Sequence, residues 1–541
     1  MSHDPEASLP AATQSSPPPQ VPPAQQGSAA KRSIRGTMAA ASLTVMVAQI
    51  ANALPGALNG EFQTTFNTVG SQLTWITAAF MVLVVVFELT FGLLGDKFGH
   101  RKLVIGGAAF VAVGSVVCAL APTVQLMWVG SAINGLGAGA IFPASLALVA
   151  AVSRNMGERI RGIAIWAGFL SAGSALSPLL GGVLAGLGSW RGAYVVVAVV
   201  SLVALVLTAL LAREAFSPHA RSLDIWGQVT FAAGLILVLF GLVQGPEAGW
   251  GTGYVLGSLV IGAVLLAVFV AIELKVESPL LDLRLFRIRQ FTVSSLVAVV
   301  GMFAFLGACF TTSMWLGPVQ HQNPLFLGLL FLLLQGPAFV LIPVISRLQA
   351  RFGSRWLMTF GFISMGAGAL IASGFDVLDR DVTAFILPCL LVGLGFAFTL
   401  SPMTAIAVNS VPRQLTGMAS ATTNLLRDLG FALGPVLVGA VALSAAGSRL
   451  VVSLQTSNLT PDQLGPAMGI AEAGGPIALN SLPAGVPGAA GSEFALAALG
   501  AGFAQAYLVV AIAALAAAAL SYFGLRGAKE PDMDEAVHQS A

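Results

Sequence analysis

Long apolar runs separated by short polar stretches recur along nearly the whole chain. A bilayer core needs roughly 20 apolar residues per helix, so runs of that length predict membrane spans. The first eight cover residues 37–58, 74–95, 102–121, 125–151, 160–187, 191–212, 226–244 and 253–273. The others cover 291–318, 325–346, 355–375, 382–409, 415–445 and 501–525. About fourteen spans are therefore predicted, and an even number puts both termini on one side.

Lys and Arg residues orient these spans, because positively charged loops stay in the cytoplasm. With the N-terminus inside, all but four of the 25 Lys and Arg residues fall in inner loops or tails, the exceptions being Arg191, Arg380, Arg427 and Arg449. We therefore expect a multi-pass protein of the cytoplasmic (inner) membrane with both termini in the cytoplasm.

Composition favours a membrane carrier over a soluble enzyme. Hydrophobic residues make up 56% of the 541 residues and charged residues 9%, against roughly 25% charged in soluble domains. The sequence contains no Gly-x-Ser-x-Gly elbow, His-Glu-x-x-His motif or phosphate-binding Gly-rich loop. We expect no enzymatic activity, no cofactor or metal and no nucleic-acid partner. The expected partners of a monomeric chain are a small amphipathic substrate, protons and the lipid bilayer.

The polar stretches suggest a domain plan. Residues 1–35, whose first part is rich in Pro, Ser, Gln and Ala, are expected to be a disordered cytoplasmic tail. Residues 36–212 would form a six-helix bundle, and 213–274 two extra spans. Residues 291–525 would form a second six-helix bundle that includes an extracytoplasmic loop at 446–500, followed by a cytoplasmic tail at 526–541.

A basic cytoplasmic linker is predicted at residues 275–290, between the extra spans and the second bundle. Its apolar residues alternate with three arginines, which is typical of a helix lying on the inner membrane surface. The apolar residues are Leu281, Leu283, Leu285 and Phe286.

Two motifs repeat within the chain. The loop GLLGDKFGHRK at 92–102 returns as SRLQARFGSRW at 346–356, which pairs Gly99 with Gly353. The spacing Gly-x-x-x-Ser-Pro-x-x-x-Gly of 173–182 returns at 430–439, with Gly434 in place of the serine. Two matches at nearly the same offset indicate a duplicated half of six helices, as in carriers built from repeats.

These motifs resemble the major facilitator superfamily. Its loop signature G-x-L-x-D-R-x-G-R-K is nearly reproduced by Gly92, Leu94, Asp96, Lys97, Gly99, Arg101 and Lys102. Fourteen spans, SPLLGG at 177–182 and PLLDLRLFR at 279–287 make the chain similar to the fourteen-span drug:proton antiporters, the QacA/EmrB-like group.

The resemblance implies an all-α polytopic fold of two six-helix bundles, related by pseudo-twofold symmetry, plus two extra central helices. It also implies export of amphipathic, often cationic compounds in exchange for protons. The chain departs from the family pattern at two positions. Met46 stands where span 1 usually has an acid, and Ser131 where span 4 usually has an arginine.

Ionisable residues within spans are the candidates for proton coupling, because each costs about 2.5–3.5 kcal/mol to insert. Glu88 lies eight residues before Asp96, or roughly 12 Å into the membrane. Arg427 and Asp428 lie near mid-membrane; adjacent helical residues point in different directions, so each is expected to pair elsewhere. Asp428 is a candidate replacement for the absent span 1 acid. The alternatives are a snorkelling Glu88 and a structural salt bridge.

The loop at 92–102 is predicted to form a gate between the halves. Its acid and bases could pair and separate as the halves rock, although the basic residues also signal topology. Its glycines would let the backbone turn sharply and let neighbours approach closely. The gating residues are Gly92, Gly95, Asp96, Lys97, Gly99, Arg101 and Lys102.

Two further groups of residues are candidates. A close-packed, kinked helix is predicted from Gly173, Ser177, Pro178, Gly181 and Gly182. The polar residues predicted to line a substrate cavity, with interhelical hydrogen bonding as the alternative, are Gln49, Asn52, Asn134, Gln228, Gln335 and Asn424.

The leading functional prediction is a secondary active transporter that exports amphipathic small molecules, such as drugs or antibiotics, by proton antiport with alternating access. The two absent family residues leave a second prediction open, an importer or facilitator of a small nutrient. A non-transporting membrane partner protein is the third.

Overall fold

The computed structural model describes residues 23–68, 71–153, 156–215, 224–276, 279–411 and 416–526, and its regular elements there are helices. The first half and the two extra helices comprise α1 (Pro23–Ala53), α2 (Pro55–Phe66), α3 (Gln72–Phe98), α4 (His100–Leu120), α5 (Val124–Val152), α6 (Met156–Gly186), α7 (Trp190–Leu211), α8 (Ile225–Ala248) and α9 (Gly253–Glu273).

The second half begins after the 3-10 turn η1 (Leu283–Arg287) and includes the short π-helix η2 (Trp315–Val319) and the 3-10 turns η3 (Val382–Phe385) and η5 (Ala489–Gly491). Its α-helices are α10 (Arg289–Met314), α11 (Pro324–Val340), α12 (Ile342–Phe352), α13 (Ser354–Ser373), α14 (Ile386–Asn409), α15 (Thr416–Gln455), α16 (Pro461–Asn480) and α17 (Ser492–Gly524).

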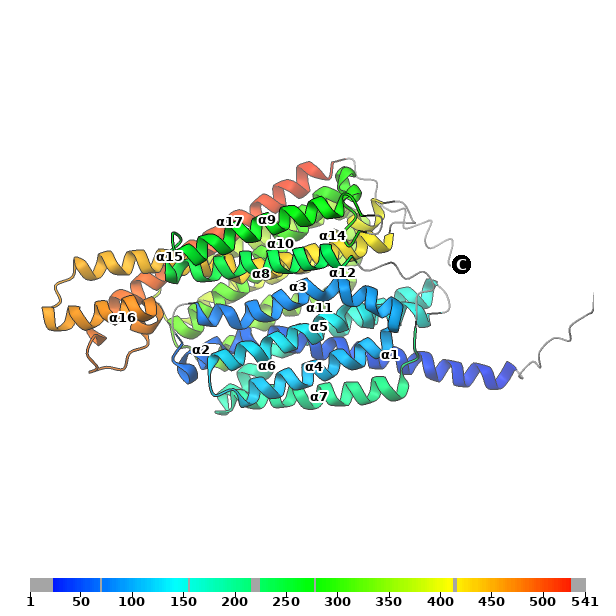
Figure 1. The fold of residues 1–541 in the computed structure, drawn as a ribbon, viewed down its shortest axis with the longest axis horizontal. Helices are drawn as coiled ribbons and strands as arrows, with labels where there is room; N and C mark the ends of the chain where they lie inside the picture. The colour runs from blue at the N-terminus through cyan, green and yellow to red at the C-terminus, as the bar shows by residue number, and fades with distance from the viewer. Residues whose placement is uncertain are drawn as a thin grey trace, which may run out of the picture.

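Most of these helices run side by side along one axis of an elongated bundle (Figure 1). Among the described residues, 13 helices are long and apolar enough to cross a membrane, and α11 is a shorter apolar helix at a fourteenth predicted position. The all-α polytopic fold predicted from the sequence is confirmed.

The predicted duplication is visible in how the helices pack. In the first half α1 packs on α6, α3 on α5, and α4 on both α5 and α7. In the second half α10 packs on α15, α11 on α14, and α13 on both α14 and α17. Between the halves, α6 contacts α11 and α15 contacts α3, so these contacts also form a matched pair.

The repeated motifs occupy matching turns and contacts. Gly99 ends α3 with φ 106° and Gly353 ends α12 with φ 81°, a left-handed conformation that favours glycine at both points. A side chain at Gly173 would meet the Met46 carbonyl of α1, and one at Gly430 would meet the Val299 carbonyl of α10. The repeat therefore conserves backbone geometry as well as sequence.

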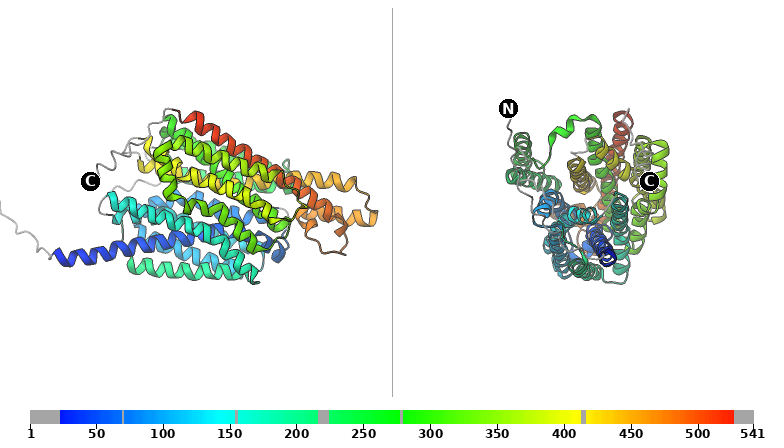
Figure 2. Two further views of the ribbon diagram at one scale, coloured as in Figure 1. Left: turned by 180° about the vertical axis from the view of Figure 1, so that it is seen from behind. Right: turned by 90° about the vertical axis from the view of Figure 1, so that its right-hand side faces the viewer.

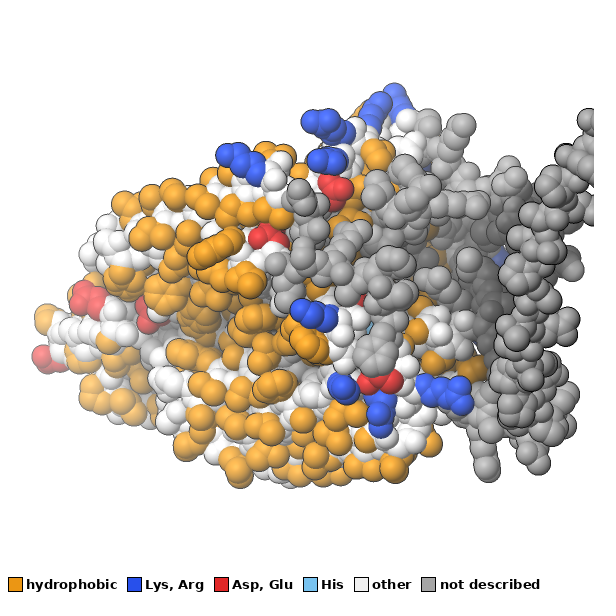
Figure 3. Space-filling view, turned by 45° about the vertical axis from the view of Figure 1, so that its right-hand side comes forward, with side chains coloured by type: hydrophobic (Ala, Val, Ile, Leu, Met, Phe, Trp, Pro, Cys, Tyr) orange, Lys and Arg blue, Asp and Glu red, His pale blue; other side chains and the backbone are white. Residues whose placement is uncertain are grey.

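The two described chain ends lie at one end of the bundle, called here the terminal end, and α16 lies at the opposite, outer end (Figure 2). In the face shown in Figure 3, an apolar surface covers most of the bundle between basic side chains towards the terminal end and acidic ones at the outer tip. An apolar girdle of this kind is what the acyl chains of a bilayer cover.

Helix α1 begins at Pro23, within the stretch that the sequence predicts to be a tail, so the described helix extends beyond the predicted first span. That stretch contains Ala, Gln, Lys and Arg, which are good helix formers, and it continues the first span beyond the apolar segment. Residues 1–22 and the expected tail at 527–541 lie outside the described part of the chain.

The segment at 446–500 is largely helical, so its description as a loop is wrong. Helix α15 continues to Gln455, α16 follows, and α17 begins at Ser492. These helices enclose a small core of their own. The core contains the buried residues Leu450, Leu454, Ala467, Leu479, Ala495 and Ala498. Apolar residues spaced between Gly and Pro supply enough burial to order the segment.

The linker at 275–290 forms the short η1 turn instead of a surface helix. Leu281 and Leu285 are buried against the bundle, and Leu283 and Phe286 are partly buried. The Leu281 amide also donates to Glu273 Oε2 at 3.0 Å. The apolar side chains that suggested membrane binding are therefore used for packing onto the protein.

Prolines break two of the predicted spans. Span 37–58 is divided between α1 and α2, with Pro55 at the start of α2. Span 325–346 is divided between α11 and α12, with a proline in the first turn of α12. Hydropathy windows do not detect these breaks because proline interrupts helical hydrogen bonding without making a segment polar.

Candidate functional site

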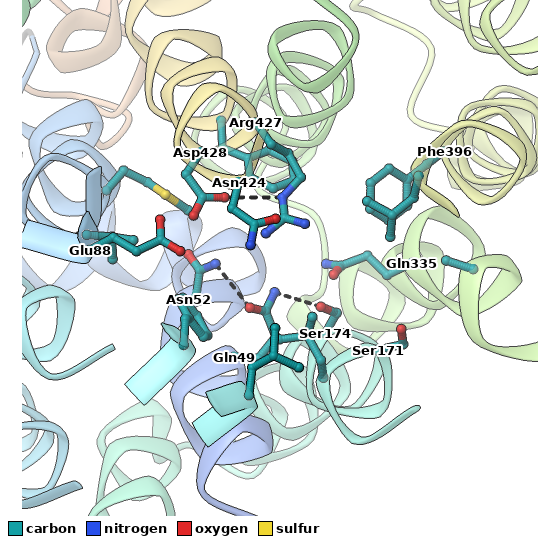
Figure 4. Close-up of a pocket in the computed structure, with 18 of the residues that line it drawn as sticks. Gln49, Asn52, Glu88, Ser171, Ser174, Gln335, Phe396, Asn424, Arg427 and Asp428 are labelled. Carbon is teal, nitrogen blue, oxygen red and sulfur yellow. Dashed lines mark hydrogen bonds and ion pairs between the residues drawn. The ribbon is translucent and has the colours of Figure 1, made fainter. Parts of the chain in front are cut away.

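A cavity lies between the two halves of the bundle (Figure 4). Its region nearer the terminal end has an empty volume of about 800 Å³, and its region nearer the outer end about 660 Å³. Both regions share the lining residues Gln49, Asn52, Met81, Ser174, Gln335, Phe396 and Phe431. Helices α1, α3 and α6 of the first half and α11, α14 and α15 of the second half supply these side chains.

Two carboxylates from opposite halves meet in the terminal region of the cavity. Glu88 of α3 and Asp428 of α15 are each 5% exposed, and both line this region. Figure 4 shows their carboxyl groups facing one another. Glu88 Oε2 is buried and has no hydrogen-bond partner among the described residues. A single site therefore contains the acids that the sequence placed in two distant spans.

Arg427 forms an ion pair with its neighbour Asp428, with 3.4 Å between Arg427 Nε and Asp428 Oδ1. The expectation that these adjacent residues pair elsewhere is wrong. The long arginine side chain bends back along the helix and brings its guanidinium to the carboxylate, although the two Cβ atoms diverge. The cavity thus contains one fixed positive charge beside two acids.

Amide side chains form the opposite wall. Gln49 Nε2 donates to Ser174 Oγ at 2.7 Å, and Asn52 Nδ2 donates to Gln49 Oε1 at 3.5 Å. Gln335 and Asn424 also line the cavity, and Figure 4 shows them on the side of the second half. The structure thus brings together Gln49, Asn52, Glu88, Gln335, Asn424, Arg427 and Asp428, all singled out from the sequence.

Aromatic rings dominate the outer region. Phe305 and Phe396 stack with centroids 3.8 Å apart and an interplanar angle of 10°, and Phe431 lies 6.4 Å from Phe305. Phe310 and Phe331 complete this wall. A ligand that spans both regions would contact charge and amides at one end and aromatic faces at the other, as amphipathic compounds require.

Two predicted cavity residues lie elsewhere. Asn134 is buried between α4 and α5, where it accepts from Ser115 Oγ at 3.2 Å. Gln228 joins α8 to α3, where its Nε2 donates to the Val86 carbonyl at 2.6 Å and Thr90 Oγ1 donates to its Oε1. The prediction that they line the cavity is wrong, because both side chains are used for interhelical hydrogen bonds.

The predicted close-packed helix is α6, and it contacts both halves. Ser177 Oγ donates to the Ile50 carbonyl of α1 at 2.6 Å, and a side chain at Gly181 would meet Leu54. A side chain at Gly182 would meet the Pro324 carbonyl of α11 at 2.5 Å, and one at Gly328 the Pro178 carbonyl at 2.6 Å. Small residues therefore let α6 and α11 touch through their backbones.

The predicted gating loop is the turn between α3 and α4. Asp96 Oδ1 lies 3.1 Å from His100 Nε2, so its partner there is His100 and not Arg101. The Arg101 amide donates to Glu214 Oε1 at 2.8 Å, and its Nη2 donates to the Ala209 carbonyl of α7. The turn is thereby attached to the end of α7, and its gating role stays a prediction.

The three glycines of the predicted gate have different surroundings. Of the three, only Gly99 has the left-handed backbone of a sharp turn, and its amide donates to the Gly95 carbonyl at 2.9 Å. Gly92 and Gly95 lie within α3, so the expectation that these two glycines let the backbone turn is wrong. Gly95 is buried, and a side chain there would overlap the His100 ring, whereas one at Gly92 would meet only Pro143 of α5 at 3.8 Å. Gly95 therefore makes room for the ring that reaches Asp96.

The outer ends of the halves are in contact. Asn59 Nδ2 of α2 donates to Ser313 Oγ of α10 at 2.9 Å, and a side chain at Gly60 would meet Gly317 of η2 at 3.1 Å. Helix α16 bridges the same junction: Gln63 Nε2 donates to Ser481 Oγ at 3.1 Å, and Asn480 Nδ2 to the Val319 carbonyl at 3.0 Å.

Several lining residues were missed from the sequence. Ser171 and Ser174 share a face of α6, but serine in a membrane helix usually bonds to its own backbone and gives no distinct signal. An aromatic residue within a span is equally consistent with packing in the core and with contact to lipid. The sequence therefore missed the lining residues Phe396, Phe431 and Trp166. A face-by-face analysis of α6 could have found the serines.

The fold and the cavity between paired halves define a secondary transporter of the major facilitator class. A model of the Major Facilitator Superfamily matches residues 40–435. The chain belongs to this superfamily.

Several relatives with similar sequences are named as resistance or efflux proteins. The chain is 28% identical over 404 residues to the multidrug resistance protein Stp of Mycobacterium tuberculosis, covering 74% of this chain and 75% of that protein. It is 28% identical over 502 residues to the tetracenomycin C resistance and export protein of Streptomyces glaucescens, covering 92% of both. The multidrug efflux pump LfrA of Mycolicibacterium smegmatis is 28% identical over 463 residues, covering 84% of this chain and 89% of the pump.

Solved structures share the fold at low identity. A bacterial homologue of the human lysosomal transporter Spinster, in an inward-facing and unoccupied conformation, matches with a TM-score of 0.65 at 14% identity, covering 93% of this chain and 99% of that one. An autoinhibited peptide transporter of the POT family matches with a TM-score of 0.61 at 16% identity, covering 92% and 98%. These likenesses confirm the major facilitator fold.

Proposed function

We propose that this chain exports amphipathic small molecules across the cytoplasmic membrane in exchange for protons, as a fourteen-span drug:proton antiporter. The observation that carries the proposal is the meeting of Glu88 and Asp428, one from each half, beside Arg427 in the central cavity. The names of the relatives, which describe multidrug resistance, multidrug efflux and tetracenomycin C export, support the direction of transport.

The chemistry of the acid pair supports coupling to protons. Two carboxylates in contact repel when both are charged, so a proton bound between them stabilises the pair. Because the acids belong to different halves, a rocking motion that separates α3 from α15 would change how well they share that proton. Proton release to one side and substrate release to the other would then belong to the two opposite states between which this movement alternates.

The cavity lining supports an amphipathic substrate. The amides of Gln49 and Asn52 and the charges of Arg427 and Asp428 would contact its polar part. The stacked Phe305 and Phe396 would contact its apolar part. The basic terminal end supports the assignment of both termini to the cytoplasm, because positively charged loops stay inside.

Transport in proteoliposomes tests the proposal. We expect an imposed proton gradient to drive a fluorescent amphipathic dye against the direction of proton flow, and we expect Glu88→Gln and Asp428→Asn each to abolish gradient-driven transport. Asp462→Asn, at an exposed site on α16, is the matched control and should transport normally. Unchanged transport in both cavity variants would refute proton coupling through this pair.

A deletion strain tests direction. Loss of an exporter sensitises cells to a panel of amphipathic antibiotics, whereas loss of an importer impairs growth on a nutrient. Normal antibiotic sensitivity together with a nutrient defect would support the importer and contradict export.

A further inference from the structure

A basic and aromatic cluster lies where α13 begins and α17 ends, at the terminal end of the bundle. It consists of Arg355, Trp356, Tyr522, Phe523 and Arg526, and α13 and α17 pack directly on each other. Trp356 is 54% exposed and Phe523 58% exposed, so the cluster lies on the surface of the bundle and not in the cavity. Aromatic side chains in this position are typical of the boundary between acyl chains and headgroups.

The two arginines converge on one ring. Arg355 Cζ lies 4.4 Å and Arg526 Cζ 5.1 Å from the centroid of Tyr522. Arg355 also lies 5.3 Å from the ring of Trp356, and Arg526 lies 5.0 Å from that of Phe523. These contacts fix the direction of both guanidinium groups and keep two positive charges close together.

Neither arginine has an acidic partner in the part of the chain that the structure describes. The ion pairs there are His100–Asp96 and Arg427–Asp428, both remote from this cluster. Arg355 Nε is buried and has no hydrogen-bond partner among the described residues. The cluster therefore has two positive charges without a counter-charge. It also has one hydrogen-bond donor that is not used. A bound anion would satisfy both.

We propose that this cluster binds the headgroup of an anionic phospholipid in the leaflet at the terminal end. Phosphate oxygens match the planar donor fork of arginine, and basic groups beside a membrane attract anionic lipids. One helical turn beyond Trp356, Phe360 is 59% exposed and offers an apolar surface along α13 for an acyl chain. The lipid would bridge the first helix turn of α13 and the last of α17, independently of the transport cavity.

Two other occupants are chemically reasonable. A soluble phosphate ion would use the same donors but not the apolar surface of Phe360. The sequence after Arg526 also contains acidic residues, Glu530, Asp532, Asp534 and Glu535, which could neutralise the arginines instead. The lipid is favoured because the cluster combines charge with the exposed aromatic rings of Trp356 and Phe523.

Native mass spectrometry of the full-length protein with added phosphatidylglycerol tests the site. We expect binding to weaken about fivefold with each arginine removed, in Arg355→Gln and Arg526→Gln, the factor that one basic residue contributes at an anionic surface. The matched control, Arg284→Gln with Arg287→Gln, removes two exposed arginines from η1 and should bind as the wild type does. Phosphatidylcholine should bind all variants equally.

The other outcomes overturn the proposal. Retention of phosphatidylglycerol by the double glutamine variant would exclude the site, and an equal loss in the η1 control would reduce it to general surface charge. Displacement of the lipid by inorganic phosphate would identify a soluble anion. Binding that appears only after removal of residues 527–541 would identify the acidic tail as the occupant. A double lysine variant keeps the positive charge at both positions. If it binds phosphatidylglycerol, the loss of binding in the glutamine variants is due to the lost charge and not to misfolding.

Discussion

Arg427 is the side chain on which the charge of the cavity most directly depends. It pairs with Asp428 at 3.4 Å, and Glu88 lines the same region of the cavity, so one positive charge lies beside two acids. Removing one partner of a buried ion pair leaves an uncompensated charge, which costs about 3–5 kcal/mol. Arg427 thus provides the positive charge at the proposed proton-coupling site.

Replacing Arg427 tests this dependence. We expect Arg427→Gln to lower the initial rate of dye transport in proteoliposomes at least tenfold, because the two acids then lose the positive charge beside them, and Arg427→Lys to retain part of the rate. Arg191→Gln is the control, since Arg191 stacks on Trp190 and donates to the Ala121 carbonyl, outside the cavity. An Arg427→Gln protein with full proton-driven transport would contradict the role.

Glycines in matching positions of the two halves set how closely helices approach. A side chain at Gly135 in α5 would overlap the Phe80 carbonyl of α3, and one at Gly393 in α14 would overlap the Leu333 carbonyl of α11. We expect Gly135→Ala and Gly393→Ala each to destabilise the protein by about 1–3 kcal/mol, the usual cost of overpacking. Thermal unfolding in detergent measures the effect.

The control for this pair is Gly106→Ala in α4, where a side chain would meet no atom within 4 Å. We expect its melting temperature to equal or slightly exceed that of the wild type, because alanine has the higher helix propensity. Equal stability of all three alanine variants would show that the helices separate enough to accept a methyl group.

Which site residues could be found from the sequence depended on their chemistry. Glu88, Arg427 and Asp428 were found because a charge within an apolar span is costly wherever it lies. Asn134 and Gln228 were misplaced because an amide side chain can form its hydrogen bonds between helices as well as in a cavity. The pairing of Arg427 with Asp428 was missed because backbone periodicity fixes Cβ directions but not the path of a long side chain.

At the scale of elements, apolar length predicted the spans well, but it did not predict their breaks or the outer segment. Helices α2 and α12 begin at prolines inside apolar stretches. Helix α16 and the extension of α15 form from a Gly-, Ala- and Pro-rich stretch for which the sequence predicts a loop. Their core depends on tertiary contacts between α15, α16 and α17, which local composition does not contain.

Helix α16 provides a prediction about movement of the outer end. Its last residue, Asn480, and the following Ser481 join η2 of the second half to α2 of the first, through Asn480–Val319 and Gln63–Ser481. We expect a disulfide between Gln63→Cys and Ser481→Cys to inhibit dye transport, because the outer ends could no longer separate, and a reducing agent to restore it.

The cysteines already present do not interfere with that test, since Cys118, Cys309 and Cys389 are buried. Each single variant, exposed to the same oxidant, is the control. Full transport by the crosslinked protein would mean that α16 moves with one half throughout the cycle.

At the scale of the whole molecule, the duplication was the most reliable inference from the sequence. Two repeated motifs predicted paired halves, and the structure repeats the contacts of α1 with α6 in those of α10 with α15. The cavity between the halves could not be located in this way, because a repeat states which helices correspond and not where the halves meet.

Membrane topology tests the arrangement as a whole. We expect a cysteine in place of Glu472, which is exposed on α16, to react with a membrane-impermeant maleimide in intact cells. A cysteine in place of Arg284, exposed in η1, should react only after the membrane is permeabilised. The reverse pattern would invert the orientation derived from the positive charges, and labelling of both in intact cells would contradict the span count.

The contact between α6 and α11 has one further consequence. There, glycine faces carbonyl in both directions, at Gly182 with Pro324 and at Gly328 with Pro178, so no side chain of one helix is wedged into the other at those points. The two helices can therefore tilt against each other at these points without first separating interlocked side chains. A methyl group added at either glycine would push α6 and α11 apart locally and favour the helix tilt that leaves more room for it.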